Sequence, residues 1–348
     1  MGSWFTSSQN QAMAITPAKR VWPRTIGGYV LALVCLFWVL RDFDLTGLLR
    51  RVADMKPSWI AAAIVFDILS YVCQGVRWHL LLRPPSRVTV ISTTKAIYAG
   101  LFVNEVLPLK LGEVVRATLM SRWTALKLRS IIASIFIERL WDGLWLAVGV
   151  VLVIMSVPLP RRLMEAADVF DLVILLALLA FGLFVFSAPK EPASPSDAGS
   201  TSFAKRVTGM VREGLLELRS VGYTRASALS CIISLLMLLL QGLSFWFVMR
   251  AFGLHVSFLA GLAVYIIVHV GTIIPAAPAN IGTYQFFTVL GLTLFGVDRA
   301  TAVGFSLVVF GVLTIPLWAI GFWAFASSGL TLFEVTRKLG RKEAQKST

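Results

Sequence analysis

The chain has 348 residues, of which 57% are hydrophobic and 14% are charged. Its mean hydropathy is +0.80, and its share of charged residues is well below the roughly 25% that is usual in soluble domains. Both values exclude a soluble domain of this size. The formal net charge of +14 does not indicate nucleic-acid binding, since the basic residues fall in loops between apolar segments and no basic face with interleaved aromatic residues occurs. The composition predicts an all-α polytopic membrane protein whose basic cytoplasmic loops contact anionic lipids.

The sequence contains no motif for nucleotide, metal or hydrolytic chemistry. The patterns GxxxxGK[ST], HExxH and GxSxG do not occur. The three cysteines lie in apolar segments without a CxxC pair or histidines at ligand spacing: Cys35, Cys73 and Cys231. We therefore expect a transporter rather than an enzyme, with no catalytic residue, no metal and no cofactor.

Apolar runs of about 20 residues predict the membrane-spanning helices. The polar residues 1–21 precede the first run without a cleavage site, which is typical of a retained signal anchor. Two further apolar stretches, at 89–122 and 257–297, each contain a proline-marked break and predict helical hairpins. The first has the short arms of a re-entrant element, whereas the second either re-enters or spans. Six runs predict full spans, at about 22–40, 58–82, 130–156, 169–188, 227–249 and 301–325.

Lysines and arginines predict the orientation of the chain. They gather before the first span, around the first hairpin, after the fourth span and in the basic tail at 326–348. The positive-inside rule makes these regions, and hence both termini, cytoplasmic in a multi-pass protein of the inner membrane. Within the cytoplasmic connection 189–225, residues 189–202 have linker composition, and 203–221 has the spacing of a basic amphipathic helix. The loop at 41–57 fits less well, because it places basic residues outside: Arg41, Arg50, Arg51 and Lys56.

An internal repeat divides the single membrane domain 22–325 into halves at about 22–156 and 169–325. The sequence offset from Gln74 to Gln241 equals that from Pro108 to Pro275, and after the prolines the offset grows by three positions. Each half then has the order span, span, hairpin, span. An odd number of crossings inverts the second half relative to the first, as in many secondary transporters.

The first hairpin combines a helix break with charges. Pro108 and Gly112 interrupt the helix, and four ionisable residues surround the break: Glu105, Lys110, Glu113 and Arg116. Charges and broken helices at membrane depth are costly, which makes this stretch a hypothesis for a functional site.

A charged cluster also interrupts the third long span. Glu138 and Asp142 are four residues apart and share a helix face, and Arg139 is three residues from Asp142 and can pair with it. One interpretation is an internally neutralised cluster that holds the bundle together. The other is that this cluster and the hairpin charges line a polar cavity for a lipid headgroup.

The turn of the second hairpin offers hydrogen-bonding groups without charge. Its helix breaks are Pro275, Pro278 and Gly282, and its polar side chains are Asn280, Thr283, Tyr284 and Gln285. Helix N-termini after such breaks suit a phosphate, but a simple tight turn requires the same residue types, and both interpretations stay open. Elsewhere, we expect Asp67 and His269 to be satisfied by neighbouring helices, and Arg77 and His79 to snorkel from a helix end.

Three motifs together resemble the transmembrane region of bacterial lysylphosphatidylglycerol synthases and its stand-alone flippase-like relatives. They are Leu107 to Arg116, Glu138 to Asp142 and Pro275 to Gln285, and the resemblance covers about residues 58–325. It implies movement of lipids or lipid-linked sugars across the cytoplasmic membrane by a chain without the soluble aminoacyl-transferring domain. The positions carried over are Pro108, Gly112, Glu113, Arg116, Glu138, Arg139, Asp142, Pro275 and Gly282.

The chain departs from this family pattern in the second hairpin. Ala279 and Asn280 stand where relatives commonly have a glycine-rich turn, and Gln285 stands where many have a glutamate. If that glutamate handles protons in the relatives, its absence puts proton coupling at the outer gate of this chain in doubt.

The resulting hypothesis is a translocase for a phospholipid or lipid-linked glycan, whose headgroup enters near Lys110 and Arg116. One alternative is a polyprenyl-phosphate-dependent glycosyltransferase, because Asp42 and Asp44 follow the first span on the side where such enzymes place metal-binding acids. The other is a non-catalytic accessory subunit that scaffolds lipid-synthesis enzymes.

Overall fold

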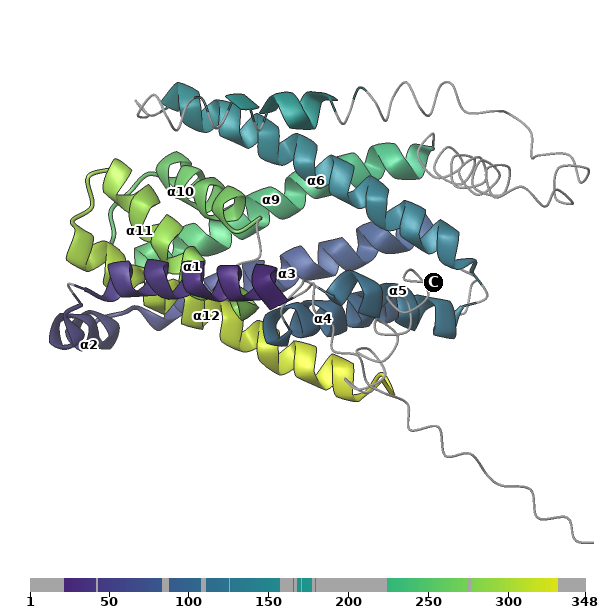
Figure 1. The fold of residues 1–348 in the computed structure, drawn as a ribbon, viewed down its shortest axis with the longest axis horizontal. Helices are drawn as coiled ribbons and strands as arrows, with labels where there is room; N and C mark the ends of the chain where they lie inside the picture. Colours follow the sequence, from purple (N-terminus) through teal and green to yellow (C-terminus); the bar gives the residue numbers. More distant parts are fainter. Residues whose placement is uncertain are drawn as a thin grey trace, which may run out of the picture.

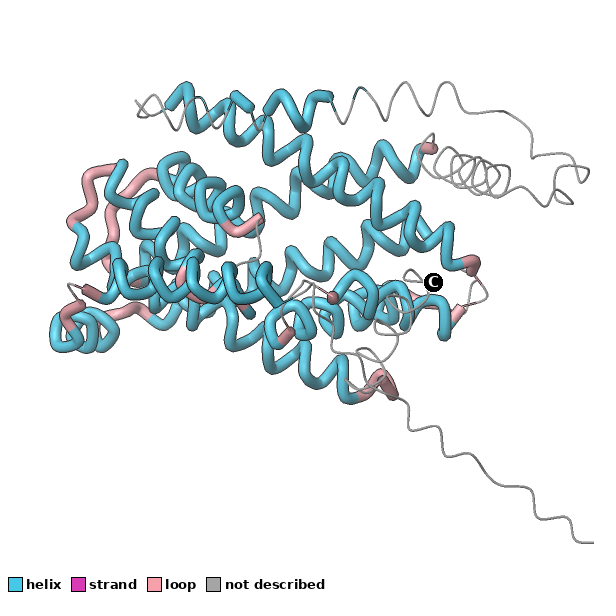
Figure 2. Tube along the Cα trace, in the orientation of Figure 1, coloured by secondary structure: helices cyan, strands magenta, loops and turns pink. Residues whose placement is uncertain are grey.

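The computed structural model describes residues 22–41, 43–82, 88–107, 111–124, 126–156, 224–273 and 277–330, with a few positions between 165 and 179. Every element of regular structure in this part of the chain is a helix (Figure 2). The N-terminal segment 1–21, the linker 189–202, the predicted amphipathic helix at 203–221 and the tail beyond residue 330 lie outside the described residues. Of the predicted span at 169–188, residues 171–176 are described and helical.

The helices of the first half begin within two residues of the predicted spans. Three of them are long: α1 (Trp22–Leu40), α3 (Pro57–Leu82) and α6 (Leu128–Ser156). The predicted first hairpin is formed by α4 (Val90–Val106) and α5 (Gly112–Trp123). Thr89 starts α4 because its side-chain oxygen accepts the backbone N–H of Ser92.

The second half repeats this order with α9 (Arg225–Ala251), the hairpin arms α10 (Phe258–Gly271) and α11 (Thr283–Leu294), and α12 (Arg299–Ala326). A short 3₁₀ helix, η2 (Pro278–Asn280), lies in the turn of the hairpin. Among the described helices, α3, α9 and α12 are long and apolar enough to cross a membrane. The chain is thus a polytopic helical membrane protein.

The segment 41–57, predicted as a loop, contains a helix, α2 (Leu45–Ala53). Leucines at 45, 48 and 49 and Val52 follow the three- and four-residue spacing of an apolar helix face, and this local signal was missed. Leu45 is 56% exposed and Leu49 is 60% exposed. An exposed apolar face beside Arg50 and Arg51 is typical of a helix that lies in the membrane interface.

The helix starts reproduce the predicted repeat. The interval from the start of α3 to the start of α9 is the same as that from α4 to α10. After the hairpin break the interval is three positions longer, and it is again the same from α5 to α11 and from α6 to α12. α3 and α9 pack along each other in opposite directions, and the two hairpins lie at opposite ends of the bundle (Figure 1). The order of elements therefore repeats with inverted direction.

Each hairpin packs against its own apolar cluster, and α12 contributes to both. The cluster around α4 and α5 includes Trp78 of α3 and Ala324 near the end of α12. The cluster around α10 and α11 includes Phe245 of α9 and Phe305 near the start of α12. η2 also contacts α4, so the turn of the second hairpin reaches the first arm of the other hairpin.

Gly112, predicted as a helix break, is the first residue of α5 and lies against the backbone of α4. A Cβ atom at Gly112 would collide with the carbonyl group of Gly100, and one at Gly100 would lie 2.6 Å from the carbonyl oxygen of Gly112. The two arms can approach this closely only because both residues are glycine.

Replacing Gly112 by alanine is expected to lower the stability of the protein by about 1–3 kcal/mol, because the backbone must move to admit the methyl group. Thermal unfolding in detergent micelles measures this loss. Gly311→Ala is the matched control, since the nearest atom to its added Cβ lies 4.0 Å away. Equal melting temperatures for the two variants would contradict the close approach of α4 and α5.

Candidate functional site

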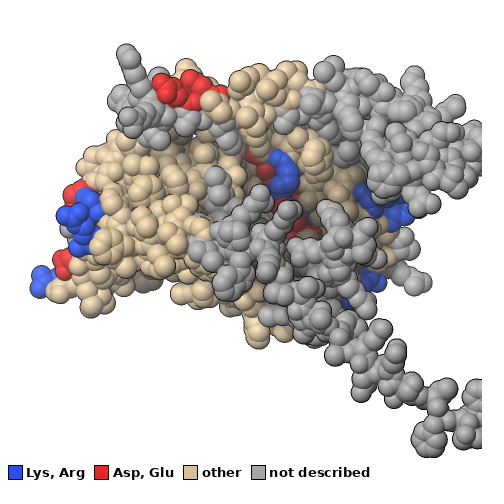
Figure 3. All heavy atoms as spheres, viewed as in Figure 1, with Lys and Arg blue, Asp and Glu red and all other residues tan. Residues whose placement is uncertain are grey.

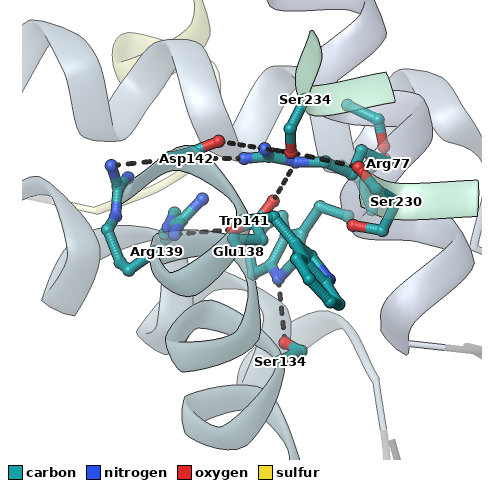
Figure 4. A network of polar contacts seen from close by, with 12 residues as sticks. Arg77, Ser134, Glu138, Arg139, Trp141, Asp142, Ser230 and Ser234 are labelled. Carbon is teal, nitrogen blue, oxygen red and sulfur yellow. Dashed lines mark hydrogen bonds and ion pairs between the residues drawn. The ribbon is translucent and has the colours of Figure 1, made fainter. Parts of the chain in front are cut away.

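A network of ion pairs crosses the middle of the bundle, with Arg77 of α3 at its centre (Figure 4). The Arg77 Nε atom lies 3.3 Å from Oε1 of Glu138, and its Nη2 atom lies 3.2 Å from Oδ2 of Asp142. Its Nη1 atom also donates to Asp142 and to the Ser234 hydroxyl of α9. The side chain is fully buried, so the prediction that Arg77 snorkels to the surface is wrong. It stays inside because two carboxylates of α6 compensate its charge.

The first hairpin joins this network through Arg116 of α5. Its Nη2 atom lies 2.8 Å from Oε2 of Glu138, and both side chains are almost fully buried. The guanidinium also lies over the ring of Trp78, 4.9 Å from the ring centroid. Trp78 in turn donates from Nε1 to the Ser134 hydroxyl at 3.0 Å. Glu138 therefore bridges two arginines that come from different helices.

One end of the network is exposed at the surface of the bundle. The Arg139 Nε atom lies 2.9 Å from Oε1 of Glu113, and its Nη1 atom lies 3.5 Å from Oδ2 of Asp142, which confirms the predicted pairing of Arg139 with Asp142. The side chains of Arg139 and Glu113 are 50% and 47% exposed, and that of Asp142 is 27% exposed. Figure 3 shows acidic and basic side chains together in a hollow in the middle of this face.

The network has no net charge, and its side chains range from half-exposed to fully buried. Three arginines face three carboxylates, so no charge in it is left uncompensated: Arg77, Arg116, Arg139, Glu113, Glu138 and Asp142. From its half-exposed outer pair it leads inward to fully buried groups. These contacts hold α3, α5, α6 and α9 together, as the first predicted interpretation requires, and the graded exposure leaves the second interpretation open.

Two other predicted residues of the first hairpin, Pro108 and Lys110, lie outside the described residues. Glu105 lies on the last turn of α4 and interacts electrostatically with Tyr71 and Tyr284.

The turn of the second hairpin is closed by its own polar groups. Ala279 and Asn280 have φ angles of 55° and 52°, and Gly282 has a φ of 92°. The Gly282 N–H donates to Oε1 of Gln285 at 2.7 Å, and the Thr283 hydroxyl donates to the carbonyl oxygen of Asn280 at 3.0 Å.

These contacts favour the tight-turn interpretation for Thr283 and Gln285, which are both buried. Tyr284 packs against Phe310, with ring centroids 5.5 Å apart. Pro275 lies outside the described residues, and Pro278 begins η2. Ala279 and Asn280 adopt left-handed φ angles where relatives commonly have a glycine-rich turn, and asparagine tolerates this conformation better than most residues.

The two hairpins close their breaks by the same device. In the first, the side-chain oxygen Oδ1 of Asn104 accepts the N–H of Gly112 at 2.6 Å. In the second, Gln285 does the same for Gly282. An amide oxygen is neutral and thus caps the exposed N–H at low cost in an apolar surrounding. Sequence analysis missed Asn104, because its partner lies eight residues away across the break.

The sequence predicts that Asp67 and His269 are satisfied by neighbouring helices. Asp67 of α3 precedes Arg77 by ten residues, or about 15 Å along the helix, and is buried. The Nδ1 atom of His269 in α10 lies 3.4 Å from the hydroxyl of Tyr265. Tyr265 belongs to the same helix, so this is not the expected contact with a neighbouring helix. Among the described residues, no group of three or more His, Cys, Asp and Glu side chains is placed to hold a metal ion. Asp42 lies outside these residues, and Asp44 precedes α2.

The sequence matches the family described as "Lysylphosphatidylglycerol synthase TM region" over residues 25–321. A protein of Methanothermobacter thermautotrophicus named "UPF0104 membrane protein" is 24% identical over 262 residues, which cover 72% of this chain and 77% of that protein. A protein of Haloferax volcanii named "Glycosyltransferase AglD" is 30% identical over 131 residues. That match covers 37% of this chain and 21% of the length of the glycosyltransferase.

Proposed function

Because the chain belongs to the family of the lysylphosphatidylglycerol synthase transmembrane region, we propose that it moves a phospholipid or lipid-linked glycan across the membrane. The observation that carries this proposal is the neutral network that leads from half-exposed Arg139 to buried Arg77 and Arg116. A polar headgroup that follows it avoids hydrocarbon, while its acyl chains remain in the bilayer. The chain is then a transporter of the cytoplasmic membrane with both termini inside.

The arginines of this network are the groups that can bind a phosphate headgroup. Guanidinium groups bind phosphate with two parallel hydrogen bonds, and three arginines lie along the route. In the absence of a ligand, the carboxylates neutralise these arginines and keep them extended. A phosphate at Arg139 displaces Glu113, which removes one of the two ion pairs between α5 and α6. Headgroup binding thus loosens the first hairpin from the bundle.

The second hairpin forms the other end of the route. Its turn contacts α4 and presents Asn280 and Tyr284 without any charge. A phosphate held by the arginines therefore meets weaker ligands here, which favours release over capture. We place entry of the headgroup at the first hairpin, on the cytoplasmic side. Anionic lipids bind at the basic loops there. Lipid-synthesis enzymes are candidate partners that supply the substrate.

Glycosyl transfer is the second candidate, and the similarity to a protein named a glycosyltransferase favours it. The similarity covers about a fifth of that protein, so it leaves most of the glycosyltransferase unmatched. A third candidate is a non-catalytic accessory subunit of lipid-synthesis enzymes, which would not translocate lipid itself.

One reconstitution separates these candidates. The purified protein is placed in liposomes with a headgroup-labelled anionic phospholipid or a labelled polyprenyl-phosphate sugar, and label reaching the opposite leaflet is followed with a membrane-impermeant quencher. Translocation faster than in protein-free liposomes is expected, without sugar transfer to an acceptor. Sugar transfer that is lost in Asp42→Asn would establish the glycosyltransferase instead, and inactivity in both assays would favour the accessory subunit.

A further inference from the structure

Asp67 is a buried carboxylate that lies apart from the arginine network. It is 7% exposed, and its side chain makes no hydrogen bond or ion pair with any residue that the structure describes. Every carboxylate of the network, by contrast, faces an arginine. The expectation that a neighbouring helix satisfies Asp67 is therefore not met within the described part of the chain.

Tyrosines from both halves of the repeat interact electrostatically with Asp67: Tyr71 of α3, Tyr98 of α4, Tyr265 of α10 and Tyr284 of α11. Tyr71 follows Asp67 by four residues on the same helix face, and its ring packs against that of Tyr98 with centroids 5.5 Å apart. Tyr98 and Tyr265 are separated by the same offset as Pro108 and Pro275, so they occupy equivalent positions in the two hairpins.

The hydroxyl groups of these tyrosines differ in their partners. That of Tyr98 is buried without a partner among the described residues, whereas that of Tyr265 donates to Oε1 of Gln241 at 2.7 Å. Tyr71 and Tyr284 also interact electrostatically with Glu105. The titratable groups near Asp67 are thus the four tyrosines, two of which also interact with Glu105. No described lysine, arginine or histidine forms an ion pair with Asp67.

An unpaired ionised carboxylate is unfavourable at membrane depth, and the simplest compensation is a bound proton. Tyrosine hydroxyls can donate hydrogen bonds to the ionised form and accept one from the protonated form. Tyr98 belongs to one hairpin, and Tyr265 and Tyr284 belong to the other. A movement of either hairpin therefore changes how many donors face Asp67 and with it the preferred protonation state.

We propose that Asp67 binds and releases the proton that couples to movement of the hairpins. The carboxylate takes one proton from water on one side of the membrane and returns it to water on the other side. This inference rests on the proposed function and deepens it by naming the coupling ion. Gln285 does not supply an acid in the second hairpin, and Asp67 of α3 is a buried acid that can take this role instead.

Infrared difference spectra of the purified protein in lipid nanodiscs test proton binding directly. Between acidic and neutral pH, the wild type is expected to show a C=O stretch of a protonated carboxylic acid that is absent from Asp67→Asn. Asp54→Asn, which changes an exposed carboxylate after α2, is the matched control and should keep the band. Identical spectra for the wild type and Asp67→Asn would overturn the proposal.

A transport experiment tests whether proton binding is coupled to lipid translocation. In liposomes, a gradient of one pH unit is expected to shift the steady-state distribution of the labelled lipid about tenfold for one proton per lipid, and Asp67→Asn is expected to lose this shift. A shift that follows a sodium gradient at constant pH would overturn the assignment to a proton. A wild type that translocates no lipid overturns the proposed function, while the infrared spectra still decide whether Asp67 binds a proton.

Discussion

Replacing Arg77 by alanine is expected to lower the free energy of unfolding by about 3–5 kcal/mol, because it leaves the buried charge of Glu138 and the partly buried charge of Asp142 without their partner. The same substitution removes the hydrogen bond to Ser234, which joins α3 to α9. Thermal unfolding of the purified protein in detergent micelles measures the loss.

Arg250→Ala is the matched control for this prediction. Arg250 also lies near the end of a long helix, but it is partly exposed and contacts Trp246 and His255. Contacts of this kind contribute about 0.5–1 kcal/mol. If Arg77→Ala melted at the same temperature as Arg250→Ala, the network would not hold the bundle together.

The long helices and their repeat could be predicted because apolar runs and a constant offset between matching residues are both visible in the sequence. Runs of apolar residues give the long helices their lengths, and proline breaks mark the hairpins. The extra three residues of the second turn, expected from the change in spacing, appear as a longer interval between equivalent helix starts after the break than before it. The pairing of Arg139 with Asp142 was predictable for the same reason, since residues three apart meet on one helix.

The centre of the site could not be predicted, since its contacts join residues far apart in the sequence. Arg77 lies 61 positions from Glu138 and 157 positions from Ser234. Near the end of an apolar helix, an arginine that snorkels and one that is buried have the same local sequence. The surroundings of Asp67 could not be predicted for the same reason, because Tyr265 and Tyr284 come from the other half of the chain.

Arg139→Gln is expected to slow lipid translocation by at least about tenfold while the protein stays folded. Its ion pair with Glu113 is half exposed, and such pairs contribute only about 0–1 kcal/mol to stability. A charge-assisted hydrogen bond to a phosphate contributes about 1.5–3 kcal/mol, and each 1.4 kcal/mol corresponds to a factor of about ten. A purely structural role would therefore leave transport almost unchanged, whereas headgroup binding would not.

The most direct test compares initial translocation rates of a headgroup-labelled anionic phospholipid in liposomes that contain equal amounts of folded protein. Arg225→Gln is the matched control, because it removes an exposed arginine at the first residue of α9, outside the network. We predict that the wild type and Arg225→Gln translocate at similar rates and that Arg139→Gln is at least about tenfold slower. Equal rates for all three proteins would contradict a headgroup route along the arginine network.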